Sequence, residues 1–241
     1  MNNTYKLTHN VSFGEIDANY RMRFDGILSV FQIATLFHSI ELNVGTNVLL
    51  ENSNAFWVLS KAKFKILKTP TFSNKITVET WPLPVTPVRF NREYKITVAD
   101  ADCVLGTSEW VTLDATTKML RKSQTIKYPF DLVHRTDVSG AGEYSRKREP
   151  LTDDNLVYTH TVRFVDIDPN NHTNNVAYVK MALNAFSIEE FNSANFTEFE
   201  IQFMLESYYG NKVSIYKVKT DYGYYVEGKT NEKTVFICIL K

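Results

Sequence analysis

Cysteine is scarce in this chain of 241 residues, which contains only Cys103 and Cys238. Both lie in apolar stretches, and neither has the Cys-x-x-Cys spacing of a zinc or redox site. We therefore expect two buried free thiols, no disulfide and no metal site. Such usage is typical of the reducing cytoplasm, where the sequence predicts that this protein works.

An excess of charge is missing as well, because 27 Lys and Arg residues balance 27 Asp and Glu residues. A formal net charge of zero gives no reason to expect nucleic acid as a partner. No apolar run approaches the roughly 18 residues of a membrane span. The polar segment Met1–Leu7 has no apolar core of a secretion signal. We expect a globular protein that engages neither nucleic acid nor membrane.

Two common catalytic motifs are missing too. The chain has no Gly-x-Ser-x-Gly elbow, which disfavours a serine hydrolase of the α/β type, and no glycine-rich phosphate loop. Aromatic residues are plentiful instead, with 16 Phe and 13 Tyr. Their number favours a β-rich structure or an apolar ligand tunnel.

The chain contains an internal repeat. Val11–Arg21 reads VSFGEIDANYR and Val162–His172 reads VRFVDIDPNNH, with Val, Phe, an acid, Ile, Asp and Asn matched at an offset of 151 (162 − 11). Further on, Asn74–Val78 aligns with Asn211–Ile215 at an offset of 137 (211 − 74). The first copy is therefore about 14 residues longer between these matches (151 − 137), and the extra length falls near Asn43–Ala55.

Each copy predicts the same order of elements: a strand, a turn, one long helix and four antiparallel strands. Apolar residues at helical spacing run from Ile27 to Leu36 in the first copy and from Ala177 to Phe186 in the second. The expected strands are Trp57–Leu67, Lys75–Pro82, Arg89–Ala99 and Val104–Leu113, then Glu198–Leu205, Lys212–Thr220, Tyr224–Lys229 and Lys233–Leu240. The fold class is α+β, with a helix against one face of each sheet.

A polar stretch rich in Gly, Ser and charge separates the copies. This composition is typical of a solvated surface connector. We expect an N-terminal unit over residues 1–136, a connector over 137–154 and a C-terminal unit over 155–241.

The copies differ at two positions that matter for chemistry. His172 stands where the first copy has Arg21, and Glu206 stands where it has Thr69. Histidine titrates near neutral pH, whereas arginine stays protonated. Glu206 lies at the end of an apolar strand, where burial would raise the pKa of its carboxyl toward that of a general base. The second copy is the candidate for catalysis.

Asp168, Asn170 and His172 lie in one predicted turn before a helix, so their side chains can converge on one pocket. The helix N-terminus, near Asn174, supplies free N–H donors and the positive end of a dipole, which suits an oxyanion. The Asp-x-Asn-x-His pattern alone is more typical of a turn with a helix cap than of a catalytic site.

The first copy tests this ambiguity, because it keeps Asp17 and Asn19 at the matched positions without the histidine. Asp168 and Asn170 can therefore be partly structural. The residues that mark a catalytic copy are His172 and Glu206.

The motif Asp168-x-Asn170-x-His172-x-Asn174-Asn175-Val176-x-Tyr178 resembles the signature of the acyl-acyl-carrier-protein thioesterases of plants and bacteria. In that family a Glu follows the motif's His, and Glu206 follows His172 at the same spacing. In plant members the next residue is Cys, whereas here it is Ser207. This departure argues against a cysteine nucleophile and favours a water mechanism with Glu206 as the base. Two first-copy segments, Trp57–Ser60 and Val78–Pro82, resemble bacterial members.

The resemblance implies a tandem, or double, hotdog fold in which two antiparallel sheets each wrap around a long helix. It implies acyl carrier protein as the partner, release of a free fatty acid, a catalytic second hotdog and no cofactor. It also implies an acyl tunnel under the helix of the first hotdog, for which Phe31, Ala34, Phe56 and Trp57 are candidates, with Asn174, Asn175 and Val176 at the thioester. Such folds often dimerise further, so a homodimer is an open expectation.

Two rival functions remain at this point. A thioesterase acting on acyl-CoA would use the same chemistry with another leaving group. A non-catalytic acyl-binding module would have a damaged second-copy site, yet Asp168, Asn170, His172 and Glu206 are all present.

Overall fold

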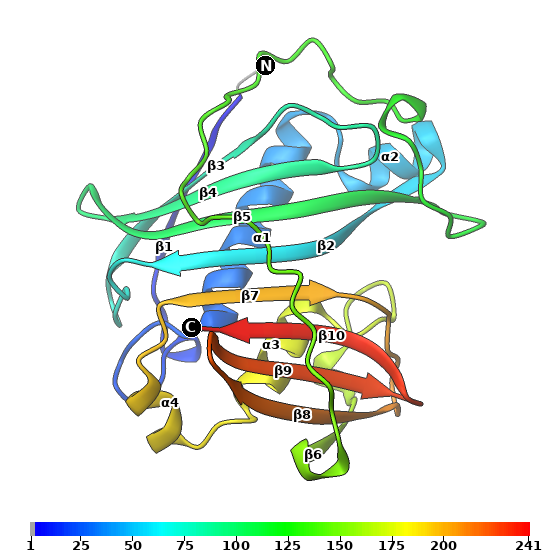
Figure 1. Ribbon diagram of the computed structural model, residues 1–241. Helices are drawn as coiled ribbons and strands as arrows, with labels where there is room; N and C mark the ends of the chain where they lie inside the picture. Colours follow the sequence, from blue (N-terminus) through cyan, green and yellow to red (C-terminus); the bar gives the residue numbers. More distant parts are fainter. Residues whose placement is uncertain (1–2) are drawn as a thin grey trace. The chain divides into compact units, whose positions relative to one another are not determined.

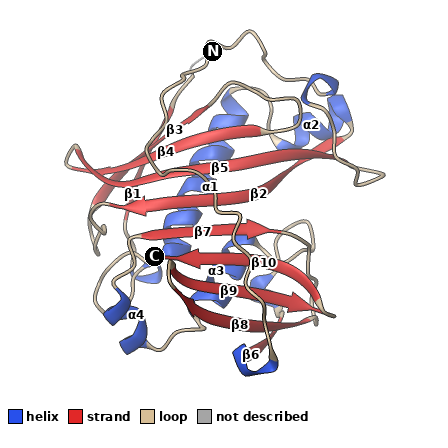
Figure 2. Cartoon of the chain, in the orientation of Figure 1, coloured by secondary structure: helices blue, strands red, loops and turns tan. Residues whose placement is uncertain are grey.

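The computed structural model describes residues 3–241, and the chain divides into two compact units, Met1–Gly142 and Glu143–Lys241 (Figure 1). The boundary between the units falls within the stretch that the sequence predicts as a connector. Each unit has an antiparallel sheet with helical segments on one face (Figure 2).

Within residues 3–142, the first unit contains five strands, two α-helices and short 3-10 turns. They are β1 (Tyr5–Asn10), η1 (Phe13–Glu15), α1 (Phe24–Glu41), α2 (Thr46–Ser53), β2 (Ala55–Ile66), β3 (Lys75–Pro82), β4 (Phe90–Val98), β5 (Ala101–Asp114) and η2 (Ser123–Thr125). All strand pairs are antiparallel, in the order β1-β3-β4-β5-β2.

The second unit repeats this plan. Its elements are η3 (Asp153–Asn155), β6 (Leu156–Thr161), η4 (Phe164–Asp166), α3 (Asn175–Leu183), α4 (Ile188–Ala194), β7 (Glu198–Phe203), β8 (Lys212–Thr220), β9 (Gly223–Thr230) and β10 (Lys233–Leu240). The strand order β6-β8-β9-β10-β7 matches that of the first unit strand for strand. The repeat inferred from the sequence is therefore present in the topology.

The predicted strands occur in both units, and β3, β8 and β10 begin and end where expected. The expectation of one helix in each unit is wrong, because α2 follows α1 in the first unit as α4 follows α3 in the second. Helix α3 ends at Leu183, and a second helix starts after Ser187, whose side chain accepts a hydrogen bond from the N–H of Glu190. A serine with acids in the next turn is a strong N-cap, so the chain begins a new helix there.

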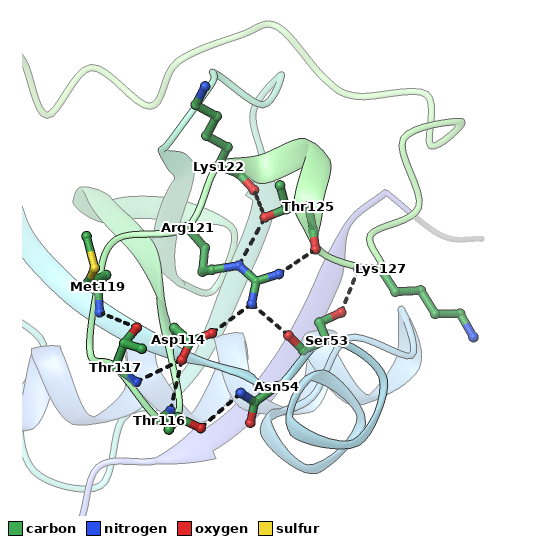
Figure 3. A network of polar contacts seen from close by, with 10 residues as sticks. All are labelled: Ser53, Asn54, Asp114, Thr116, Thr117, Met119, Arg121, Lys122, Thr125 and Lys127. Carbon is green, nitrogen blue, oxygen red and sulfur yellow. Dashed lines mark hydrogen bonds and ion pairs between the residues drawn. The ribbon is translucent and has the colours of Figure 1, made fainter.

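The extra residues of the first unit lengthen one helix and one strand: α1 has 18 residues against 9 in α3, and β2 has 12 against 6 in β7. The C-terminus of α2 is bound to the end of β5 through Arg121 (Figure 3). The Arg121 guanidinium donates to the Ser53 carbonyl at 3.0 Å, to the Asp114 carboxylate at 3.0 Å and to the Thr125 carbonyl at 2.9 Å. Hydrogen bonds from the backbone of Thr117, from neighbouring groups and from Arg121 lower the pKa of Asp114. Helix α2 is thus held against the end of β5 by a cluster of hydrogen bonds.

The core of the first unit is built on the contact between α1 and the sheet. Phe31 stacks on Tyr94 with ring centroids 4.3 Å apart and meets Phe64 edge-on at 6.2 Å. Gly106 lies beneath Phe31, and a Cβ at this position would come within 2.3 Å of the ring. The sheet therefore admits the helix closely only because this residue is glycine.

Both thiols are buried and free, as expected, and burial raises the pKa of Cys103 and of Cys238. Within residues 3–241, no single helix has the length and apolarity needed to cross a membrane. Helices α1 and α2 meet those criteria only as a pair bent by 49°.

The stretch expected as a solvated connector is hydrogen-bonded along its length. In the first unit the Ser139 N–H donates to the Glu93 carboxylate at 2.7 Å, and the Asp137 carbonyl accepts from the Trp81 indole at 2.9 Å. In the second unit the Ser145 N–H donates to the Glu200 carboxylate at 2.9 Å. Buried polar groups of the sheets need such partners, so this segment binds to each sheet.

We expect Gly106→Ala to lower the free energy of unfolding by about 1–3 kcal/mol, because the new methyl group collides with the ring of Phe31. Urea unfolding of the full chain measures this change. Gly14→Ala is the matched control, since nothing lies within 4 Å of a Cβ there, and its effect should stay within about 0.5 kcal/mol. Equal effects of the two substitutions would contradict the assignment of Gly106 as a packing constraint.

Candidate active site

Asp168 organises the turn that precedes α3. Its Oδ1 accepts the backbone N–H of Asn170 at 2.8 Å and that of His172 at 3.2 Å. Its own N–H donates to the His172 carbonyl at 2.9 Å, and Asn171 takes the left-handed conformation with φ 63°. An Asx turn of this kind fixes the backbone direction at His172.

The first unit contains the same turn. Asp17 Oδ1 accepts from the N–H groups of Asn19 at 2.8 Å and Arg21 at 2.9 Å, and the Asp17 N–H donates to the Arg21 carbonyl at 2.8 Å. Tyr20 has φ 60°, like its counterpart in the second unit. The hypothesis that Asp168 is partly structural is therefore confirmed.

The remaining carboxylate oxygen differs between the units. Arg21 Nε donates to Asp17 Oδ2 at 2.9 Å, which closes the first turn with an ion pair. In the second unit the side-chain amide of Asn170 donates to Asp168 Oδ2 at 3.5 Å. The side chain of His172 points instead toward Glu206.

His172 and Glu206 come together as the sequence predicts. Nδ1 of His172 lies 3.3 Å from Oε1 of Glu206, and the two side chains are 24% and 42% exposed. The expected burial of Glu206 is wrong, because β7 ends at Phe203 and the chain has left the sheet before it reaches the glutamate. The pair is an accessible imidazole and carboxylate, open to a substrate and to water.

Tyr208 joins this pair, although sequence reasoning missed it. Its hydroxyl donates to Glu206 Oε2 at 3.0 Å, and its ring meets the His172 ring edge-on with centroids 5.3 Å apart. The hydrogen bond to Glu206, together with burial, raises the pKa of Tyr208. The sequence signal for this contact was spacing, because Tyr208 lies two residues after Glu206 and residues two apart in an extended segment project to the same side.

Ser207, between these two residues, faces the interior and is fully buried. Its Oγ lies 2.7 Å from Thr173 Oγ1 and 2.8 Å from the Tyr178 hydroxyl. Its carbonyl accepts the Thr173 N–H at 2.8 Å, and its N–H donates to the Tyr178 hydroxyl at 2.9 Å. A hydroxyl held this way cannot act as a nucleophile, so the Thr173–Tyr178–Ser207 cluster is structural.

Some of the backbone N–H groups at the start of α3 are bound within the protein. Asn174 Oδ1 accepts the Val176 N–H at 2.8 Å, and the Asn174 N–H donates to the Asp166 carbonyl at 2.7 Å. The N–H groups of Asn174, Asn175 and Val176 were expected near the oxyanion. Those of Asn174 and Val176 bind within the protein instead, so that part of the prediction is wrong. Among residues 3–241, no acceptor is found for the N–H of Asn175, which remains the donor of this helix end.

The first-unit residues expected to line an acyl tunnel do not share one face of the sheet. Phe31 and Ala34 are buried on α1, and Trp57 packs on the same side, with its indole N–H bound to the Val44 carbonyl at 2.8 Å. Phe56 alternates with Trp57 along β2 and so faces the opposite side, where the Lys118 ammonium lies 4.6 Å from its ring centroid. Phe56 as a residue under α1 is therefore wrong.

The layer between α1 and its sheet also contains a buried cation that sequence reasoning missed. Arg92 is 7% exposed, and its Nη1 contacts His38 Nδ1 at 2.8 Å and Thr80 Oγ1 at 3.2 Å. Burial lowers its pKa, and no ion pair joins it to a carboxylate in the described part of the chain. The sequence signal for this burial was the position of Arg92 between Phe90 and Tyr94, two aromatic residues on the same predicted strand.

No cluster of three side chains that could hold a metal ion occurs within residues 3–241. The candidate site of the second unit contains a carboxylate, an imidazole, a phenol and a side-chain amide. Together they can accept and return a proton next to an open surface.

We expect Ser207→Ala to lower the free energy of unfolding by about 1–3 kcal/mol, because the buried Tyr178 hydroxyl loses its partner. A double-mutant cycle with Tyr178→Phe should give a coupling of about 0.5–3 kcal/mol. Ser214→Ala is the control, since its hydroxyl makes only a 3.5 Å contact with Thr159. If the effects of Ser207→Ala and Tyr178→Phe on the free energy of unfolding were additive, the two hydroxyls would not be coupled and the cluster would be contradicted.

Comparison with known proteins places this geometry in a family. Residues 2–125 match the Acyl-ACP thioesterase N-terminal domain and residues 149–237 match the Acyl-ACP thioesterase C-terminal domain. A chloroplastic acyl-acyl-carrier-protein hydrolase, FATB3 of Cuphea viscosissima, is 22% identical over 213 residues, covering 84% of this chain and 52% of that protein. Oleoyl-acyl carrier protein thioesterase 2 of Arabidopsis thaliana is 24% identical, covering 77% and 55%. The chain spans about half the length of these curated relatives.

Solved structures agree in fold. An acyl-ACP thioesterase from Bacteroides thetaiotaomicron superimposes with a TM-score of 0.88 at 22% identity, covering 99% of this chain and 98% of that one. A 12:0-ACP thioesterase from Umbellularia californica superimposes with a TM-score of 0.85 at 17% identity, covering 100% and 97%. Because both family domains match in order and together cover most of the sequence, this chain belongs to the acyl-ACP thioesterase family.

Proposed function

We propose that this protein hydrolyses the thioester of a fatty acyl chain carried by acyl carrier protein, releasing the free fatty acid and ending chain elongation. The observation that carries the proposal is the 3.3 Å approach of His172 Nδ1 to Glu206 Oε1 on an accessible surface of the second unit. Membership of the family supports the substrate class, since the relatives are named as hydrolases or thioesterases of acyl carrier protein.

In the proposed reaction Glu206 is the general base. Its carboxylate takes a proton from water while the water oxygen attacks the thioester carbonyl carbon. His172 lies beside the same carboxylate and keeps it in place. General-base assistance of this kind accelerates a reaction by roughly 10²–10⁴-fold.

The tetrahedral intermediate carries an oxyanion that needs donors. The N–H of Asn175, at the N-terminus of α3, and the side-chain amide of Asn170 are the donors we assign to it. When the carbon–sulfur bond breaks, the leaving thiolate takes the proton held at Glu206. The carboxylate is regenerated, and no covalent enzyme intermediate forms.

We further propose that the two units are tandem hotdogs with divided roles. The acyl chain would lie against the α1 side of the first unit, near Phe31, Ala34 and Trp57, which share that side. Arg92 in the same layer places a polar group among the aromatic residues. Acyl carrier protein is the partner that would present the thioester to the second unit.

We expect Glu206→Ala and His172→Ala each to lower kcat on acyl-ACP by about 10²–10⁴-fold, because the base or its neighbour is lost. Single-turnover assays on purified full-length variants, with folding checked by thermal melting, measure the effect. Thr69→Ala is the matched control, as Thr69 occupies the position of Glu206 in the first copy. If both site variants kept near wild-type kcat, the assignment would be wrong.

Turnover of acyl-ACP and acyl-CoA over the same ladder of chain lengths tests the substrate class. We expect kcat/KM to favour acyl-ACP by about tenfold or more, which corresponds to about 1.4 kcal/mol of transition-state binding. A preference for acyl-CoA would identify the other thioesterase activity. Tight acyl-ACP binding with no turnover of either substrate would identify a binding module.

A further inference from the structure

We infer that Tyr208 is a positioning residue for the hydrolytic site, whose phenol holds the Glu206 carboxylate and packs on the imidazole of His172. The inference rests on the proposed function, because it assigns Tyr208 a task in orienting the proposed base. Tyr208 acts through these two residues and is not assigned a contact with the substrate.

The geometry places one polar group beside each oxygen of the carboxylate. The Tyr208 hydroxyl donates to Oε2 at 3.0 Å, while His172 Nδ1 lies 3.3 Å from Oε1. Two contacts on different oxygens restrict rotation of the carboxylate about its terminal bond. Such restriction matters because Glu206 is 42% exposed and has no surrounding core to fix its rotamer.

The phenol is suited to donate permanently. Its pKa is raised, first by the hydrogen bond to Glu206 and then by burial, so it keeps its proton across the neutral range. The titratable groups that face Glu206 are Tyr208 from its own segment, His172 from the turn and Tyr178 from α3. A donated hydrogen bond stabilises the ionised carboxylate, which is the form that acts as a base.

The backbone beneath Tyr208 is held firmly. Its N–H donates to Asn211 Oδ1 at 2.9 Å, and the next turn closes with the Gly210 N–H on the Val162 carbonyl at 3.0 Å. The preceding residue, Ser207, is buried in its own hydrogen-bonded cluster. Tyr208 therefore projects from a fixed base, which a positioning residue requires.

The first unit repeats this backbone without the side chains. There the Thr71 N–H donates to Asn74 Oδ1 at 2.9 Å, and the Ser73 N–H donates to the Val11 carbonyl at 3.2 Å. Thr71 stands at the position of Tyr208 (208 − 137), as Thr69 stands at that of Glu206 (206 − 137). The tyrosine is not needed to form the turn, and it occurs where the carboxylate and the imidazole also occur.

The test compares Tyr208→Phe with Tyr209→Phe on acyl-ACP. Tyr208→Phe removes only the hydroxyl and keeps the ring contact with His172, whereas Tyr209 is 65% exposed and serves as the matched control. We expect Tyr208→Phe to lower kcat about 3- to 30-fold with KM unchanged. An unchanged KM separates a role in orienting the base from a contact with the substrate, which would raise KM.

A merely structural tyrosine would lower the folded fraction and the melting temperature and leave kcat per folded enzyme unchanged. Unchanged kcat in Tyr208→Phe, together with a large loss in Glu206→Gln, would overturn this inference and leave the proposed function standing. If Glu206→Gln also kept wild-type kcat, the proposed function itself would fail. Tyr209→Phe should match the wild type in kcat and KM.

Discussion

The second unit depends on the contact between the start of α3 and the segment that follows β7. Thr173 and Ser207 exchange backbone and side-chain hydrogen bonds in a fully buried position, and Tyr178 completes the cluster. His172 precedes Thr173, while Glu206 and Tyr208 flank Ser207. The buried cluster therefore brings the three exposed side chains together, and their mutual distances follow from hydrogen bonds that water cannot easily replace.

Comparison of the two units separates scaffold from chemistry. The Met22 N–H donates to the Pro70 carbonyl at 2.8 Å, as the Thr173 N–H donates to the Ser207 carbonyl at 2.8 Å. The Asx turns at Asp17 and Asp168 also match. One backbone frame thus occurs twice, and in the first unit it carries an arginine closed on its own aspartate. The difference lies in side chains that point out of the frame, which can change with little cost in stability.

The layer between α1 and its sheet combines close packing with polar groups. Gly106 lets Phe31 approach the sheet, and the side of β2 that bears Trp57 faces the same layer. Arg92 and His38 are buried within this layer and contact each other. Buried polar groups need such partners, so the layer is not uniformly apolar.

The sequence alone determined the repeat, the order of the elements along each copy and the pairing of His172 with Glu206, because these follow from periodic spacing and from residues that differ between two aligned copies. It did not determine the strand order in each sheet, where β2 pairs with β5 and β7 with β10 instead of continuing a meander. Local signals could not decide which groups are buried. Where the chain leaves the sheet decides that Glu206 is exposed and that the Ser207 hydroxyl is buried. The local fold also decides that the N–H groups of Asn174 and Val176 bind within the protein. Only the tertiary structure brought Tyr208 onto Glu206 and separated Phe56 from Trp57, since hydrogen-bond direction and sheet face are set by three-dimensional packing.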